Sequence, residues 1–270
     1  MPESYENTLD HVASDTIDHV AAITDPGDRN RENHLWGDRL VIGVGNTAAW
    51  LFPILMIAIV TQVIVRKMGF NQAWLDDMQW WIYGSALLTG FGYAITTNSH
   101  VRVDIFHEHF SVRKKARIES FSLGWLLLPF LVMMTDILTH YAWSSIIARE
   151  GSDSANGLHR LYLLKTLLPL LFLVAITATI SALKRNVMEL TSPRLWHLLI
   201  ASFPAAWFVA ERFTHYILWW VVRLTNSEIH SRRISKEPLL ENTLWYGLAI
   251  IVVLMALSFA MARRNPTKVS

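Results

Sequence analysis

Long apolar runs alternate with short polar segments along most of the chain. A helix needs about 20 consecutive, mostly apolar residues to cross the hydrocarbon core of a bilayer. Runs of about this length occupy residues 46–65, 79–97, 122–143, 163–183, 195–222 and 244–262. The fifth is the weakest candidate, because it carries Glu211 and Arg212 in its second half. The pattern therefore predicts an all-α integral membrane protein with about six transmembrane helices.

Tryptophan residues support the ends of these runs. The indole ring is amphipathic and prefers the headgroup level of a membrane to water or hydrocarbon. Tryptophans open or close four of the six runs, at Trp80 and Trp81, Trp143, Trp196, Trp219 and Trp220, and Trp245. A soluble core gives no reason for this placement, so the residues strengthen the membrane assignment.

Composition narrows the class of function. The chain has 270 residues, of which 52% are hydrophobic and only 17% charged, as expected for a membrane protein. It has no cysteine, which excludes disulfides, thiolate metal sites and cysteine nucleophiles. No Gly-rich phosphate loop, nucleophile elbow or HExxH motif occurs. We therefore expect no catalytic or metal site, no cofactor and no nucleic-acid partner.

The N-terminal segment differs from the rest of the chain. Its first 34 residues hold eight acidic and two basic side chains. It lacks the apolar region and small-residue cleavage site of a signal peptide. We expect residues 1–37 to form an acidic cytoplasmic segment, either a solvated tail or a contact for a partner.

Basic residues predict the orientation, because cytoplasmic loops of membrane proteins are enriched in Lys and Arg. The loop after the second run contains Arg102, Arg113, Lys114, Lys115 and Arg117. Six spans would place this loop and both termini in the cytoplasm. The segment 223–243 fits less well, because it is basic yet would lie outside. If residues 195–222 instead enter and leave on one side, that segment becomes cytoplasmic and the C-terminal tail lies outside.

A short basic helix is predicted between the second and third spans. Ser111 is a candidate N-cap, and a helix from Val112 places Arg113 and Arg117 one turn apart with Lys114 beside them. Such a helix is suited to the anionic headgroups of membrane lipids. The alternative is a loop whose positive charge only fixes the topology.

Several motifs together resemble a known family. HVRVDIF at residues 100–106 is followed by RKKARIE at 113–119 and, after a hydrophobic run, by REGSDSANGLHRLYLLKTLLPL at 149–170. Their order and spacing resemble the small membrane subunit, of the DctQ type, of tripartite ATP-independent periplasmic (TRAP) transporters. The resemblance covers roughly residues 38–187, or four of the six predicted spans.

The resemblance implies a scaffold in the bacterial inner membrane, without catalytic or substrate-binding residues. In this family the small subunit supports a large membrane subunit during sodium-driven uptake of an organic acid, which a periplasmic binding protein delivers. The expected partners are those two proteins and membrane lipids. The motif positions carried over as structural or interface residues are His100, Arg102, Asp104, Glu119, Glu150, Ser152 and Lys165.

The resemblance also divides the chain. Residues 38–190 are expected to form the four-helix membrane domain of the small subunit. The usual small subunit has four spans, so residues 191–270 are expected to form an extension with about two more. The resemblance gives no role for this extension.

Small residues mark a possible helix-packing face. Ala86, Gly90 and Ala94 recur every four residues on the second span. Small side chains let another helix approach closely. That helix could belong to this chain or to the large subunit.

Ionisable residues inside the runs leave other classes of function open. Asp136 and His140 are one turn apart, as are Glu211 and His215, and could form a proton or ion path. A pair among His140, His197 and His215 could ligate haem b in the membrane anchor of a respiratory complex. A stand-alone carrier would need an internal inverted repeat, which is not evident.

Overall fold

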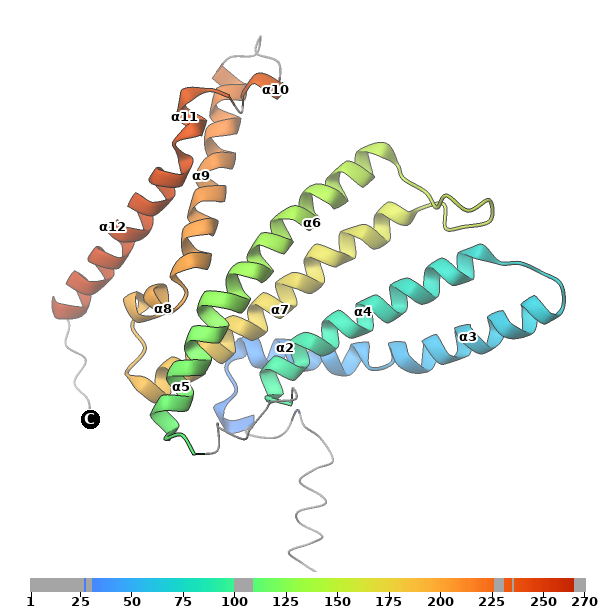
Figure 1. The fold of residues 1–270 in the computed structure, drawn as a ribbon, viewed down its shortest axis with the longest axis horizontal. Helices are drawn as coiled ribbons and strands as arrows, with labels where there is room; N and C mark the ends of the chain where they lie inside the picture. The colour runs from blue at the N-terminus through green and yellow to red at the C-terminus, as the bar shows by residue number, and fades with distance from the viewer. Residues whose placement is uncertain (1–26, 28–30, 100–108, 226–230, 235, 265–270) are drawn as a thin grey trace, which may run out of the picture.

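A computed structural model describes residues 27, 31–99, 109–225, 231–234 and 236–264. These residues form helices joined by turns, and no strand occurs among them. The longer helices lie side by side (Figure 1). The fold is therefore all-α, as predicted. The helices of at least ten residues are α2 (Trp36–Ala48), α3 (Leu51–Lys67), α4 (Ala73–Thr97), α5 (Val112–Phe121), α6 (Leu128–Ala148), α7 (Leu161–Leu190), α9 (Phe203–Thr225) and α12 (Thr243–Arg264).

Four helical segments are long and apolar enough to cross a membrane. They are Trp36–Lys67, Val112–Ala148, Leu161–Leu190 and Thr243–Arg264, and they contain four of the six predicted runs. Helices α4 and α9 have 25 and 23 residues. Neither is as apolar over a membrane-spanning length as the four segments above. Helix α4 is rich in Gly, Thr and aromatic residues, and α9 contains Glu211 and Arg212. Crossings by these two helices remain predictions.

Helices α3 and α4 form a hairpin held by polar side chains. Gln62 donates a hydrogen bond to Asp76, and Arg66 pairs with the same carboxylate at 3.3 Å. Gln79 bridges to the carbonyl of Ala58 at 3.2 Å. Ala58 is also the only buried residue of α3. Most of the surface of this apolar helix is thus available to lipid or to another protein.

Helix α7 lies at the centre of the molecule, against α2, α4 and α6 (Figure 1). Its small buried residues permit close packing: a Cβ atom at Gly92 of α4 would lie 3.6 Å from the Cα atom of Ala175. Val41, Ile95, Ala178 and Ala182 form the core cluster at this crossing. Small-residue packing of this kind is typical of membrane helices.

The basic helix predicted from Val112 begins there, with Ser111 in an extended conformation but without a side-chain cap. It is not a separate short helix. Helix α5 continues through a π-helical segment, η2 (Ser122–Leu127), directly into α6. Pro129 lies in the first turn of α6 and lacks a backbone N–H, and the wider π turn before it accommodates that loss.

The C-terminal extension forms its own hairpin beside α6 (Figure 1). The predicted run 195–222 is not one helix: the short helix α8 (Leu195–Ala201) is followed by a turn at Ser202, and α9 starts at Phe203 with Pro204 in its first turn. Two short helices, α10 (Ser231–Ile234) and α11 (Pro238–Glu241), precede α12. The indole of Trp207 donates to the carbonyl of Leu244 at 3.0 Å and ties α9 to α12.

The connections divide between two ends of the molecule. The α3–α4 and α6–α7 turns meet at one end, where the Trp74 amide donates to the carbonyl of Asn156 at 2.8 Å. At the other end the start of α2 meets the ends of α4 and α7. The end of α12 lies there too, since Arg194 before α8 donates to the carbonyl of Ala262 at 3.0 Å.

Candidate functional site

The connection between α6 and α7 contains Glu150 and Ser152 of the predicted motif positions, and Lys165 lies in the first turns of α7. Helix α6 ends at Ala148, and Arg149 adopts a left-handed conformation, with φ of 50°, that turns the chain. The Glu150 carboxylate then accepts from the Lys165 ammonium at 2.5 Å and from the Ser145 hydroxyl at 2.7 Å. Lys165 is buried, and its ammonium also lies 4.3 Å from the ring centroid of Tyr141. These contacts fix the loop to both of its helices.

The pairing also changes the acidity of the loop carboxylate. The hydrogen bond from Lys165 is the largest influence and lowers the pKa of Glu150, and the Ser145 hydroxyl lowers it further. Desolvation opposes this shift with a smaller effect. Glu150 is therefore held as a carboxylate at the outer edge of the helices.

Ser152 makes its hydrogen bonds within the loop and holds the loop's shape. Its amide donates to the carbonyl of Leu158 at 2.9 Å, and its hydroxyl accepts from the Ser154 amide at 3.3 Å. The Leu158 amide in turn donates to the Asp77 carboxylate at 3.1 Å. Asp77 belongs to α4, so the α6–α7 loop connects the α3–α4 hairpin to helices α6 and α7. Sequence reasoning missed Asp77, Ser145 and Tyr141, because their contacts depend on tertiary structure.

A buried ion pair occupies the opposite end. Asp38, in the first turn of α2, is fully buried and pairs with the Arg185 guanidinium. The same guanidinium donates to the carbonyl of Thr96 at 3.0 Å, and the Asp38 carboxylate accepts from the Leu35 amide at 2.9 Å. One cluster thus joins α2, α4 and α7. Neither Asp38 nor Arg185 was predicted to have a role in a site.

The small residues predicted on α4 do not share one environment. Ala86 is buried within the chain, Ala94 is half-buried and Gly90 is exposed. The face that packs internally includes Ser85, Thr89 and Gly92 instead. Gly90 has no heavy atom within 4 Å of a Cβ built on it. Of the three predicted positions, Gly90 is thus the one open to another molecule.

The basic side chains of α5 face outward. Arg113, Lys114 and Arg117 are all exposed, as a headgroup contact requires. The Lys114 ammonium lies 3.6 Å from the ring centroid of Phe110, and Glu119 is half-buried on the same helix. His100, Arg102 and Asp104 lie outside the described residues.

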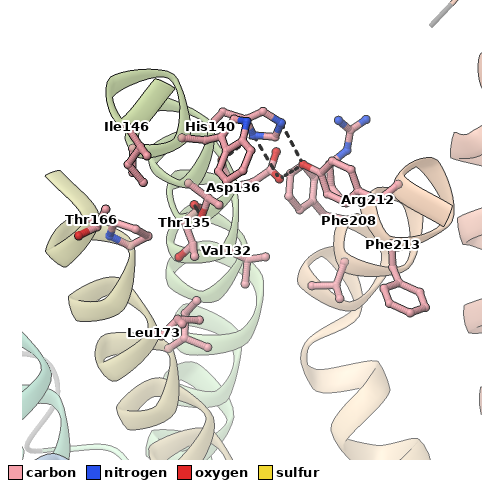
Figure 2. A pocket seen from close by; sticks show the side chains of 17 residues that line it. Val132, Thr135, Asp136, His140, Ile146, Thr166, Leu173, Phe208, Arg212 and Phe213 are labelled. Atoms are coloured by element: carbon pink, nitrogen blue, oxygen red, sulfur yellow. Dashed lines mark hydrogen bonds and ion pairs between the residues drawn. The ribbon is translucent and has the colours of Figure 1, made fainter. Parts of the chain in front are cut away.

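A second polar cluster lies between α6 and the C-terminal hairpin (Figure 2). The Tyr216 hydroxyl donates to the Asp136 carboxylate at 2.5 Å and lies 3.4 Å from Nε2 of His140. The Nδ1 atom of His140 lies 2.9 Å from the Asp136 carbonyl. Asp136 therefore has one partner on α9, Tyr216, and one on its own helix, His140.

Glu211 and Arg212 form a two-point ion pair next to this cluster, at 2.5 and 2.7 Å. The Thr243 hydroxyl of α12 donates to the same Glu211 carboxylate at 2.9 Å. Pairing lowers the cost of the Glu211 and Arg212 ions in a membrane, so these two residues need no proton path to explain them. The sequence could locate the ions but not Tyr216 or Thr243.

Two of the three histidines considered as haem ligands, His140 and His197, are separated. His140 is stacked on Tyr216, whereas His197 is on α8 near the other end of α6 and packs on Trp196. Among the described residues, no three of His, Asp and Glu are grouped to hold a metal ion. The separation argues against haem ligation by His140 and His197 together.

Comparison with known proteins identifies one family. The model of the family described as "Tripartite ATP-independent periplasmic transporters, DctQ component" matches residues 55–189, half of the chain. The match begins within α3 and ends one residue before the end of α7, and includes the Glu150–Lys165 pair but not α8 to α12. No curated protein and no solved structure matches significantly.

Proposed function

The chain belongs to the family of the DctQ component of TRAP transporters, and from that membership we propose that it scaffolds the large membrane subunit during uptake of an organic acid. The family is one of transporter components rather than enzymes. In this proposal a periplasmic binding protein delivers the acid, the large subunit moves it with sodium, and the small subunit holds the large one in place.

One observation carries the scaffold role: α3 is an apolar helix that packs on α4 but leaves most of its surface uncovered by its own chain. Only Ala58 is buried, and side chains such as Met56, Ile57 and Val60 are more than half exposed. Van der Waals packing drives helix association in membranes, so such a face can receive a helix of another subunit. Gly90 on the neighbouring α4 has no side chain, so a partner helix can approach this surface closely there. We place the contact with the large subunit on α3 and α4.

The proposed topology has six crossings, with α4 and α9 as the two less apolar spans. The end of the molecule that carries α5, α8 and the end of α12 is rich in Arg and Lys, so it lies in the cytoplasm. The exposed Arg113, Lys114 and Arg117 then meet anionic headgroups of the bacterial inner membrane. The Glu150 loop lies on the periplasmic side, where the binding protein docks.

The motif residues His100, Arg102 and Asp104 complete the proposed interface from the cytoplasmic side. Changing Arg102→Glu should reduce recovery of the complex more than Lys114→Glu, because Arg102 belongs to the motif and Lys114 only to the basic helix. Equal losses in affinity purification would mean that both residues act on topology alone.

Gly90 allows a direct test of the α4 surface. Gly90→Leu should fold normally but lose the large subunit in mild-detergent purification, because the added side chain keeps the partner helix at a distance. Gly84→Leu is the matched control, since a Cβ there also meets nothing within 4 Å. If Gly90→Leu retains as much large subunit as Gly84→Leu does, the interface lies elsewhere.

The required role is tested by uptake. Deleting this chain while retaining the large subunit should abolish accumulation of the acid that the periplasmic protein binds. The full chain should also purify from native membranes in a one-to-one complex with a large hydrophobic subunit. Normal uptake without the chain contradicts the proposal.

A further inference from the structure

An open cleft lies along the contact between the family-matched domain and the C-terminal extension. It has a volume of about 750 Å³ and is bounded by α6, α7 and α9 (Figure 2). Most of its wall is apolar, and one region is charged. The volume is within the range of sites that hold small ligands.

The apolar region is suited to a hydrocarbon chain. Val132, Leu173, Ile176, Val209 and Phe213 line it and come from all three helices. Leu173 and Phe213 appear on opposite walls in Figure 2. The cleft lies between helices of a membrane protein, and an empty space of this size would forfeit dispersion contacts along its whole wall. Lipid is the abundant apolar material that can fill it.

The charged region presents one cation and one anion together. The Arg212 side chain is 33% exposed and uses Nε and Nη2 on Glu211, which leaves other guanidinium donors for a ligand. The Asp136 side chain is 22% exposed, accepts from the Tyr216 hydroxyl and has Nδ1 of His140 3.9 Å from its Oδ1, and its carboxylate keeps further lone pairs. Partly exposed ions at a membrane-facing site need polar partners.

We propose that this cleft binds one zwitterionic phospholipid with a primary amine in its headgroup. Its phosphate lies against Arg212, its ammonium group against Asp136, and one acyl chain fills the apolar region. The charges of the headgroup complement the two exposed ions. An anionic headgroup without an amine would leave Asp136 unmatched and add a negative charge beside it. The proposal depends on membrane insertion and not on the transport role.

Native mass spectrometry of the delipidated full chain tests this site. Added phosphatidylethanolamine should give a one-lipid complex about tenfold tighter than phosphatidylglycerol does, since charge-assisted hydrogen bonds decide the difference. Asp136→Asn should remove this preference while the acyl chain still binds. Equal affinity of the native chain for the two lipids overturns the proposal.

Filling the apolar region should prevent binding. Val209→Trp should lose the one-lipid complex, whereas Ile217→Trp on the same helix should keep it, since the two native side chains are 48% and 47% exposed but only Val209 lines the cleft. Leu173→Trp and Ile180→Trp repeat the comparison on α7, where the native side chains are 49% and 50% exposed but only Leu173 lines the cleft. Helical content is checked by circular dichroism. Lipid retained by both filled variants, or a second copy of the chain bound in place of lipid, refutes the site.

Discussion

Asp38 shows how one residue can join parts of the chain that are distant in sequence. Its carboxylate is fully buried, and its pairing with Arg185 brings the start of α2 to the end of α7. Removing one member of a buried pair leaves an uncompensated charge, whereas removing both can be nearly neutral. The pair is therefore a strong constraint, even if its net contribution to stability is small.

Asp38→Ala should destabilise the protein by roughly 3 to 5 kcal/mol, because Arg185 is left without its buried counterion. Adding Arg185→Leu to this variant should recover part of the loss. Unfolding in a detergent micelle, followed by circular dichroism, measures both effects. A double variant that is less stable by the sum of the two single losses would show that the residues act independently.

Glu150→Gln should lower the thermal midpoint at neutral pH, because it removes the charge that pairs with buried Lys165. Asp153→Asn, an exposed position in the same loop, is the control and should have little effect. The pKa of Glu150 is lowered in the folded state. The advantage of the native chain over Glu150→Gln should therefore be full above the ordinary carboxyl pKa of about 4.3 and disappear as pH falls through the folded-state value. An advantage that persists undiminished in acid would contradict this assignment.

The sequence predicted some of these residues and not others, for a physical reason. Glu150 and Lys165 are in one recognisable motif, so the family pattern identified both. Asp38 and Arg185 each looked like an ordinary charged residue near a helix end. Only the crossing of α2 and α7 brings them together, and a hydropathy pattern contains no information about which helices cross.

At the scale of elements, the π-helical segment η2 is where the C-terminal extension contacts the family-matched helices, through α8. A Cβ atom at Gly124 would lie 1.9 Å from the carbonyl oxygen of Ala201, which is backbone and cannot rotate away. The Trp125 indole donates to the neighbouring carbonyl of Ile200 at 3.2 Å. The glycine thus lets the end of α8 rest directly on the helix that leads into α6.

Gly124→Ala should destabilise the protein by roughly 1 to 3 kcal/mol, because α8 must move outward. Gly43→Ala should have the opposite sign and stabilise by roughly 0.5 to 1 kcal/mol, since that exposed helical position has open space around it. Thermal unfolding gives both values. Limited proteolysis should show faster cleavage near residues 191–194 in Gly124→Ala, and an unchanged rate would mean that α8 is not held at this contact.

The apolar runs predicted the elements better than their connections. Helices occur at all six predicted runs, because length and hydrophobicity determine them locally. The continuity of α5 with α6 and the break between α8 and α9 were not predicted. Both depend on backbone detail at Pro129 and Ser202, and an average over 20 residues does not resolve such detail.

For the whole molecule, the division of connections between two ends has a testable consequence. Because the chain contains no cysteine, single cysteines can report the position of each connection without a background signal. In intact cells an impermeant maleimide should label Asp153→Cys and Lys236→Cys. It should label Lys114→Cys and Arg264→Cys only after the membrane is opened.

Labelling of Lys236→Cys separates the two topologies of the extension. Protection at this position, together with labelling of Arg264→Cys in intact cells, would mean that α9 does not cross. A soluble periplasmic marker and a cytoplasmic marker serve as controls for membrane integrity.

The Asp38–Arg185 pair also sets an order of events during synthesis. About 150 residues separate its two members. At 5 to 20 residues per second, the ribosome needs about 7 to 30 s to make the arginine after the aspartate. During that interval α2 carries a carboxylate whose final counterion does not yet exist. The contacts of α2 can therefore be complete only after α7 is made, although α2 also packs against α4, which is made earlier.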